Sequence, residues 1–427
     1  MKMATAALHT RQSIDRDHLI FFSKINLFGL GLLGFWTVID TLLLPDMAER
    51  TAPASLTGSA VGVISVIGVG LAVLIQPIAG RVSDAWHGDD TRRPFILTGL
   101  VLLAPGLLVF GIGSNFIFVL AGFVLLQLAT NIAQAAFQAL IPDLVEDDQR
   151  GAASGVKNTL SVLGAAVGLL GGQGIMSLTG STWLVLLYLG LLITSTGLLT
   201  VYWTPKSSSK AKQRPPSIRA ALDLHTMLAE FRQVIRKHGT FRLAVIAQFL
   251  FLLGCYPAQR FLLLFLRDRF GEGVEQRASV GVVLAILLAV ISALIAGALS
   301  DALGRKPVLI FSVLSGAIGL VLIGFSPTLS FAAIAGGLIA IGLGAFQAAN
   351  WALMNDDLPE GQSASTLGVA NIATAGAGTV AGLFGPLADA VDALIPQATY
   401  QVLFGLAGVV ASLSLIPLWR IHGSHGT

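Results

Sequence analysis

Apolar runs of about 20 residues recur along almost the whole chain, and they constrain its fold more than any other feature. A helix of that length crosses the hydrocarbon core of a bilayer and satisfies its own backbone hydrogen bonds there. Of the 427 residues, 54% are hydrophobic and only 11% are charged, whereas soluble domains carry about 25% charged residues. The chain is therefore predicted to be an all-α membrane protein.

Charged or turn-forming clusters divide these runs into twelve predicted membrane helices. The expected ranges are 19–44, 59–78, 94–113, 115–140, 151–172, 182–203, 241–266, 278–299, 307–324, 328–352, 366–388 and 399–419. Eleven or thirteen spans would require a break such as that at 113–115 to be misread. An even number of spans places both termini on the same side.

The basic residues predict the orientation, because Lys and Arg concentrate in cytoplasmic loops. Placing both termini in the cytoplasm puts most of them there. In the middle of the chain, apolar residues recur at helical spacing from Ser217, which predicts an amphipathic helix on the membrane surface. The predicted parts are a cytoplasmic N-terminus (1–18), a six-helix bundle (19–203), a cytoplasmic linker (204–240), a second six-helix bundle (241–419) and a cytoplasmic tail (420–427).

Several function classes are disfavoured by the sequence. The formal net charge is +3 and the basic residues form no stripe, which argues against nucleic-acid binding. Cys255 is the one cysteine, so neither an intrachain disulfide nor a cysteine metal site is expected. No H-E-x-x-H, G-x-S-x-G or P-loop pattern occurs. We expect no enzyme activity, no cofactor, no metal and no direct use of ATP.

The loop after the second predicted span has a counterpart after the eighth span. Each loop has a glycine four residues before an aspartate, followed by two adjacent basic residues. The members are Gly80, Asp84, Arg92 and Arg93 in the first half, and Gly297, Asp301, Arg305 and Lys306 in the second. The chain is therefore predicted to be a duplicated six-helix unit.

With its span count, basic central segment and paired loops, the sequence resembles transporters of the major facilitator superfamily over its whole length. Within that superfamily, segments 92–96 and 131–144 are similar to the sucrose and glycoside cation symporters. The resemblance implies two pseudo-symmetric six-helix bundles with N-in/C-in topology, alternating access, and a substrate held between the halves.

The paired loops are interpreted as conformational latches. Asp84 and Asp301 lie at the cytoplasmic ends of their spans, where a carboxylate accepts hydrogen bonds from a neighbouring helix N-terminus and pairs with basic residues. Such contacts would hold one access state until transport breaks them. The alternative is a pair of solvated loop carboxylates that only fix the topology.

Asp40 in the first span and Arg260 in the seventh are the two ionisable residues expected clearly inside spans. A charge in lipid costs at least ~2.5 kcal/mol, so both are expected to face the interior or a water-filled cavity. The repeat places them at similar depth in opposite halves. The hypothesis is an ion-coupling or gating site, and the alternative is a permanent bridge or snorkelling to the outer interface.

Polar stripes on the fourth and tenth spans suggest substrate contacts, because amides donate to and accept from hydroxyl groups and tryptophans stack on sugar rings. The candidate substrate-binding residues are Trp36, Asn131, Gln134, Gln138, Gln347, Asn350 and Trp351. The alternative is hydrogen bonding between helices without ligand contact.

Together these features predict a secondary active transporter, a proton-coupled symporter of a small polar solute, with a sugar or glycoside favoured. A drug or metabolite efflux antiporter is the alternative, although the drug/proton antiporters carry a Gly-Pro signature in span five and no proline occurs between Gly151 and Gly172. A non-transporting membrane scaffold is a further alternative. The expected partners are a small-molecule substrate, a proton or other cation and the bilayer of the cell (inner or plasma) membrane. We expect a monomer.

Overall fold

The computed structural model describes residues 16–86, 90–146, 149–206, 239–271, 273–356 and 373–421, with isolated positions between 217 and 238. Every regular element in these ranges is helical. The N-terminal half contains α2 (Arg16–Asn26), α3 (Phe28–Val38), η1 (Ile39–Leu43), α4 (Leu44–Thr51), η2 (Ala54–Leu56), α5 (Thr57–Ala85), α6 (Arg93–Ile112), α7 (Phe116–Gln138), α8 (Leu140–Leu144), α9 (Arg150–Thr179) and α10 (Thr182–Trp203). The C-terminal half contains α13 (Gly239–Phe270), α14 (Glu275–Leu303), α15 (Arg305–Gly324), α16 (Leu329–Asp356), α18 (Phe384–Leu394), η3 (Pro396–Ala398), α19 (Thr399–Ser412) and α20 (Leu415–Arg420).

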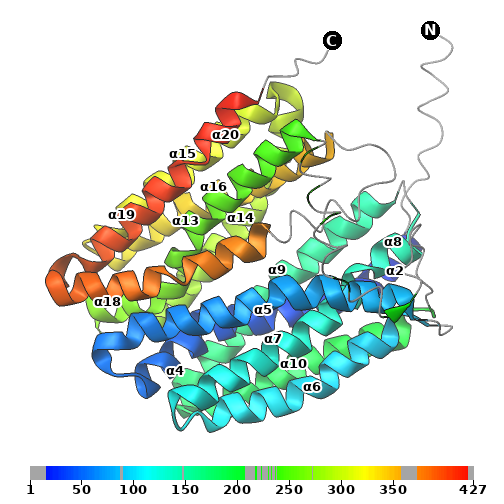
Figure 1. Ribbon diagram of the computed structural model, residues 1–427, viewed down its shortest axis with the longest axis horizontal. Coiled ribbons are helices and arrows are strands. Elements are labelled where there is room, and N and C mark those ends of the chain that lie inside the picture. The colour runs from blue at the N-terminus through cyan, green and yellow to red at the C-terminus, as the bar shows by residue number, and fades with distance from the viewer. Residues whose placement is uncertain are drawn as a thin grey trace.

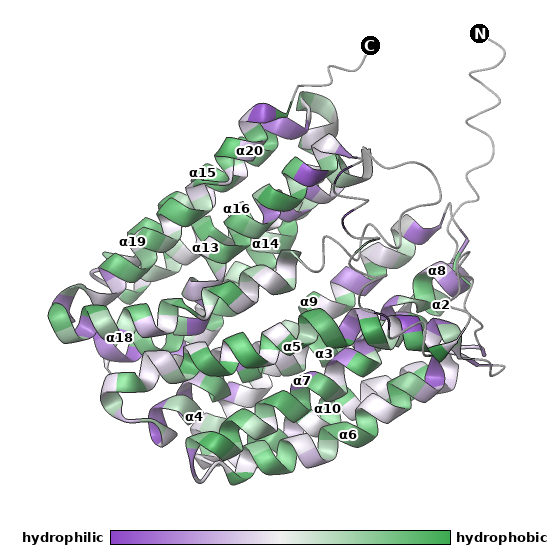
Figure 2. Cartoon of the chain, in the orientation of Figure 1, coloured by the Kyte–Doolittle hydropathy of each residue, from purple (hydrophilic) through white to green (hydrophobic). Residues whose placement is uncertain are grey.

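Eleven segments of the described residues are long and apolar enough to cross a membrane. The remaining predicted span, 366–388, lies partly outside the described residues, as does the predicted amphipathic helix of the linker. The described part of the predicted span 366–388 is helical over 373–381 and continues in α18 after a turn at Gly382 and Leu383. Figure 2 shows hydrophobic residues along the helices and hydrophilic residues gathered at α4 and near α8.

Two of the helices, α5 and α14, are longer than the apolar runs that predicted them. α5 continues to Ala85 and α14 to Leu303, so Gly80, Asp84 and Gly297 lie on the last turns of helices. The prediction that these residues lie in loops was wrong. Hydropathy marks only the lipid-facing length, whereas backbone hydrogen bonds carry a helix on beyond the bilayer.

Each half has its own packed core, and the two halves repeat the same pairing of helices. The third and fourth spans, α6 and α7, pack together as the ninth and tenth, α15 and α16, do. Phe35 and Phe123 are buried in the N-terminal core, and Phe251 stacks on Phe346 in the C-terminal core with 4.4 Å between ring centroids. This repetition agrees with the predicted duplication.

The two halves meet at one end of the molecule. There α18 packs against α5 and η2, and α13 contacts α4 and η1. Figure 1 shows the two halves converging at this end and diverging toward the opposite end, where α8 and α20 lie. We call the first end the closed end. The second is the terminal end, because both chain termini lie on that side.

Glycines allow the close contact between α5 and the eleventh-span helices at the closed end. A Cβ added at Gly382 would lie 2.6 Å from the carbonyl oxygen of Gly62, and a Cβ at Gly385 would collide with the carbonyl of Gly58. Side chains of any size would therefore hold the two halves apart. Small residues bring helix backbones together in this way inside membranes.

Candidate functional site

Asp40 lies where the first span departs from regular α-helical geometry. It belongs to η1, a π-helical segment between α3 and α4. A π-bulge inserts an extra residue into a helical turn, and such bulges frequently occur at functional sites. The Asp40 side chain is partly buried.

Arg260 approaches Asp40 from the other half of the molecule. It lies on α13 and is 8% exposed, and its Nη1 atom has no hydrogen-bond partner. A Cβ added at Gly378 would lie 3.6 Å from its Nη2 atom and 3.3 Å from Val69 on α5. The guanidinium therefore lies close to both halves.

The charges of Asp40 and Arg260 interact electrostatically. No salt bridge of 4.0 Å or less joins the two side chains among the described residues. The structure thus holds the two charges near each other without a direct ion pair, so a small movement between the halves would change their separation.

Another ionisable residue, Lys157, lies in the candidate membrane span Ala152–Thr179 of α9. Its Nζ atom lies 5.2 Å from the centroid of the Phe137 ring. Lys157 lies within the predicted range 151–172, six residues from its start, so it adds a further charged residue near the end of a span.

The predicted substrate-binding residues of the N-terminal half are held mostly by that half. Asn131 is 5% exposed, and its Nδ2 atom donates to the side-chain oxygen of Gln127 at 2.9 Å. Trp36 packs edge-on against Phe123, with 5.6 Å between ring centroids. Gln134 and Gln138 of the same group are partly buried.

The predicted substrate-binding residues of the C-terminal half are likewise held mostly by their own half. Asn350 is fully buried, and its Nδ2 atom donates to Gln248 Oε1 at 3.1 Å; Gln248 Nε2 in turn donates to Thr374 Oγ1 at 2.6 Å. Trp351 packs against the C-terminal core, and Gln347 Oε1 is buried without a hydrogen-bond partner. Sequence reasoning missed Gln248, a buried amide inside the predicted range 241–266.

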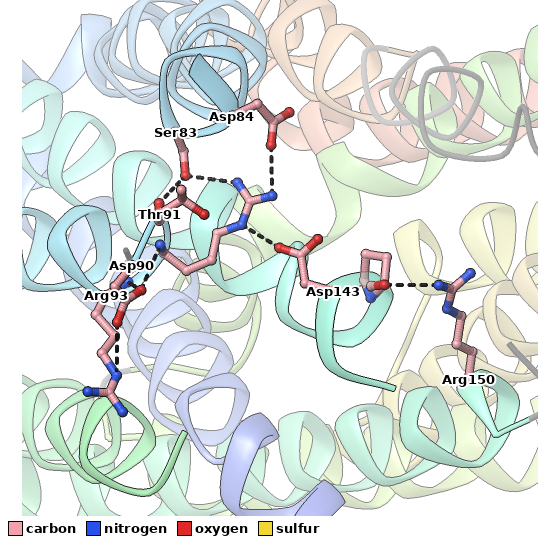
Figure 3. Close-up of polar contacts among 9 residues, drawn as sticks. Ser83, Asp84, Asp90, Thr91, Arg93, Asp143 and Arg150 are labelled. Carbon is pink, nitrogen blue, oxygen red and sulfur yellow. Dashed lines mark hydrogen bonds and ion pairs between the residues drawn. The ribbon is translucent and has the colours of Figure 1, made fainter. Parts of the chain in front are cut away.

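At the terminal end, Arg92 joins two carboxylates of its own half. Its Nη2 atom lies 2.7 Å from Asp84 Oδ1 and its Nε atom lies 2.7 Å from Asp143 Oδ2, while Nη1 donates to Ser83 Oγ at 2.8 Å (Figure 3). The side chains of Arg92 and Asp143 are 3% and 4% exposed, and that of Asp84 is 27% exposed. We call these four residues the Arg92 network.

The other predicted latch residues also contact their own halves. Arg93 pairs with Asp90 at 3.2 Å and donates to the carbonyl of Thr204. Arg305 Nη1 donates to Ser300 Oγ at 2.7 Å. Lys306 Nζ donates to the carbonyls of Trp419 and Ile421, both at 3.0 Å. The side chain of Asp301 lies outside the described part of the structure, and Cβ atoms added at Gly80 and Gly297 would meet nothing within 4 Å.

At the closed end, by contrast, an ion pair crosses between the halves. Arg267 on α13 places Nη1 2.6 Å from Glu49 Oε2 and Nη2 3.4 Å from Asp46 Oδ1, both on α4. Asp46 also pairs with Arg50 at 3.0 Å. These contacts join residues more than 200 positions apart, and no motif in the sequence pointed to them.

Comparisons with known proteins agree with this architecture. Multidrug resistance protein 2 of Bacillus subtilis (strain 168) is 22% identical over 310 residues, covering 72% of this chain and 73% of that protein. Sucrose transport protein SUC4 of Arabidopsis thaliana is 31% identical over 138 residues, covering 28% of this chain and 26% of that protein. A structure of the xylose transporter XylE from E. coli superposes with a TM-score of 0.68 at 14% identity, covering 96% of this chain and 99% of that one.

The family model described as Major Facilitator Superfamily matches residues 25–382 and 275–425, which together include every span seen in the structure. The fold comparison, the duplicated halves and the family match point to a multi-pass membrane transporter that is not an enzyme. The chain belongs to the Major Facilitator Superfamily.

Proposed function

We propose that the protein is a secondary active transporter that moves a small polar solute by alternating access, in symport with protons. The observation that carries this proposal is the placement of Asp40 and Arg260. They come from opposite halves, lie within membrane spans, and attract each other without a direct ion pair. Charged residues at such positions mark ion and substrate pathways.

In this proposal the terminal end faces the cytoplasm, since the basic loop residues favour that side. The conformation is then open toward the cytoplasm and shut toward the outside. The similarity to XylE supports this assignment, because that structure is described as a partially occluded inward-open conformation. We propose the inner or plasma membrane as the location and a monomer as the working unit.

Proton coupling follows from the charge on Asp40. The ionised carboxylate attracts Arg260, which favours the arrangement that brings the two side chains together. Protonation neutralises Asp40 and removes that attraction, so the two halves can separate around the pair. One proton bound and released per cycle would then link a proton gradient to the change of access.

A sugar or glycoside is the favoured substrate. Partly buried amides at Gln134, Gln138 and Gln347 can exchange hydrogen bonds with hydroxyl groups. The partial similarity to the sucrose transport protein supports the same class. Drug efflux is the second candidate, supported by the longer match to multidrug resistance protein 2.

The test begins with a thermal-shift screen of sugars, glycosides and common drugs on the purified protein. Compounds that raise the unfolding temperature are then offered to proteoliposomes with and without an imposed proton gradient. Accumulation of a sugar or glycoside that is driven by the proton gradient supports the proposal. Extrusion of a drug in exchange for protons supports the second candidate, and uptake that is indifferent to the gradient contradicts coupling.

A further inference from the structure

The helix α5 begins at the closed end without a local cap. Its N-cap position is Leu56, whose side chain can accept no hydrogen bond, and the structure shows no side-chain cap from that residue. The first backbone N–H groups of a helix have no partner within the helix, and in most helices a Ser, Thr, Asp or Asn at this position accepts from them. Something else must satisfy the start of α5.

The missing acceptor comes from the other half of the molecule. Asp389 on α18 accepts from the backbone N–H of Gly58 through Oδ1 at 2.9 Å, and from that of Ser59 through Oδ2 at 2.6 Å. A carboxylate at a helix N-terminus gains both charge-assisted hydrogen bonds and a favourable interaction with the helix dipole. Both oxygens are used, so the fit is specific.

We propose that Asp389 is an N-cap supplied in trans, and that this contact is the gate that holds the closed end shut. When the halves separate, the N–H groups of Gly58 and Ser59 donate to water instead of to Asp389, and the Asp389 carboxylate is hydrated. The contact can therefore break and re-form without disturbing either bundle. This inference rests on the alternating access of the proposed function and adds the residue that sets the occupancy of one access state.

The surroundings of Asp389 fit a contact that is made only when the halves are close. Gly58 carries no side chain, and a Cβ there would lie 2.7 Å from Asp389 Oδ1. Asp392, one turn further along α18, instead accepts from Thr399 Oγ1 at 2.9 Å inside its own half. Two aspartates on one helix therefore have different tasks, and Asp392 is a matched control.

The test measures the distance between the halves at the closed end without substrate or gradient. Cys255 is replaced by alanine, and spin labels are attached at Ala54→Cys and Leu394→Cys, both exposed positions at this end. We expect Asp389→Ala to lower the ratio of short to long distances about fivefold, the size of a lost cap. Asp389→Asn should lower it less, because its amide oxygen still accepts, and Asp392→Asn should leave it unchanged.

A second variant separates a gate from a merely structural cap. Leu56→Ser supplies α5 with a local cap in the Asp389→Ala protein. It should restore any lost thermal stability but should not restore the short distances between the spin labels. If it restores the short distances as well, or if Asp389→Ala keeps the parent distribution, the gate is overturned. Because no transport is measured, this failure is distinct from a failure of proton coupling.

Discussion

The two ends of the molecule are held in opposite ways. At the closed end, Arg267 pairs with α4 and Asp389 caps α5, so charged groups bridge the two halves. At the terminal end, Arg92 and Lys306 bind only partners in their own halves. The described contacts of Arg92 and Lys306 thus do not depend on the other half.

This contrast shows how the chain can change access at low cost. Arg92 and Lys306 keep their local partners while the halves are apart, and we expect the closed-end groups to be hydrated when the halves separate there. A charge left buried without a partner would cost several kcal/mol.

Removing Arg92 should do the most damage. Arg92→Ala breaks a buried ion pair, since Arg92 Nε lies 2.7 Å from Asp143 Oδ2, and we expect the N-terminal half to lose about 3–5 kcal/mol of stability. Arg93→Ala is the control, because the Arg93 side chain is 28% exposed and its pair should contribute at most ~1 kcal/mol. Thermal unfolding in detergent measures both. Equal losses of stability for the two variants would mean that the Arg92 network stabilises the protein no more than the pair of Arg93 and Asp90 does.

Two glycines on the same helix should respond oppositely to alanine. A Cβ at Gly62 would collide with the carbonyl of Gly382, so Gly62→Ala should disfavour the closed end by about 1–3 kcal/mol. A Cβ at Gly80 meets nothing within 4 Å, and Gly80→Ala should stabilise the folded protein by about 0.5–1 kcal/mol through helix propensity. The spin-label pair at 54 and 394 reports closure. A parent-like distance distribution in Gly62→Ala would refute the packing argument.

Asp84 tests the latch hypothesis at the terminal end. Asp84→Asn removes a charge but little volume, and the partly exposed position should tolerate it without loss of folding. We expect the transport rate in proteoliposomes to fall at least about tenfold, a rise of ~1.4 kcal/mol in the barrier. A rate within about twofold of the parent, or ~0.4 kcal/mol, would show that Asp84 is not a latch.

The ion pair of Arg267 should have the smallest effect, because Glu49 is 44% exposed and water screens the interaction. Arg267→Gln should shift closure at the closed end by ~1 kcal/mol or less, and the shift should shrink at high salt. Arg269 is the matched control, since its Nε atom donates to the carbonyl of Ser326 within the same half at 3.2 Å. The same distance measurement applies. A shift of equal size in Arg269→Gln would contradict the proposal that the ion pair of Arg267 holds the two halves together.

The sequence predicted several membrane helices closely because hydropathy marks the part of a helix that faces lipid. The predicted range 182–203 matches α10 at both ends, and 94–113 differs from α6 by one residue at each end. The paired loops led to the family. The break in the first span at η1 was not predicted, because a π-bulge leaves no pattern in hydropathy.

The contacts of the closed end could not be predicted from local patterns. Asp389 and Gly58 are 331 positions apart, and nothing near either residue encodes the other. The sequence predicted the span from residue 59, and only the structure shows that α5 begins at Thr57 with Leu56, a poor N-cap, before it. The polar stripes on the fourth and tenth spans were predicted from residue spacing, but spacing cannot show how deeply a side chain is buried. Asn350 lies on such a stripe, and only the packing of the structure shows that it is fully buried.

In the proposed mechanism Asp40 links protons to the change of access, and Asp40→Asn removes that link. The amide mimics the protonated state, so the variant should bind substrate and support counterflow yet fail to accumulate substrate against its gradient when a proton gradient is imposed. The parent measured in the same proteoliposomes is the reference. Accumulation by Asp40→Asn at the parent rate would show that Asp40 is not the residue that couples protons to transport.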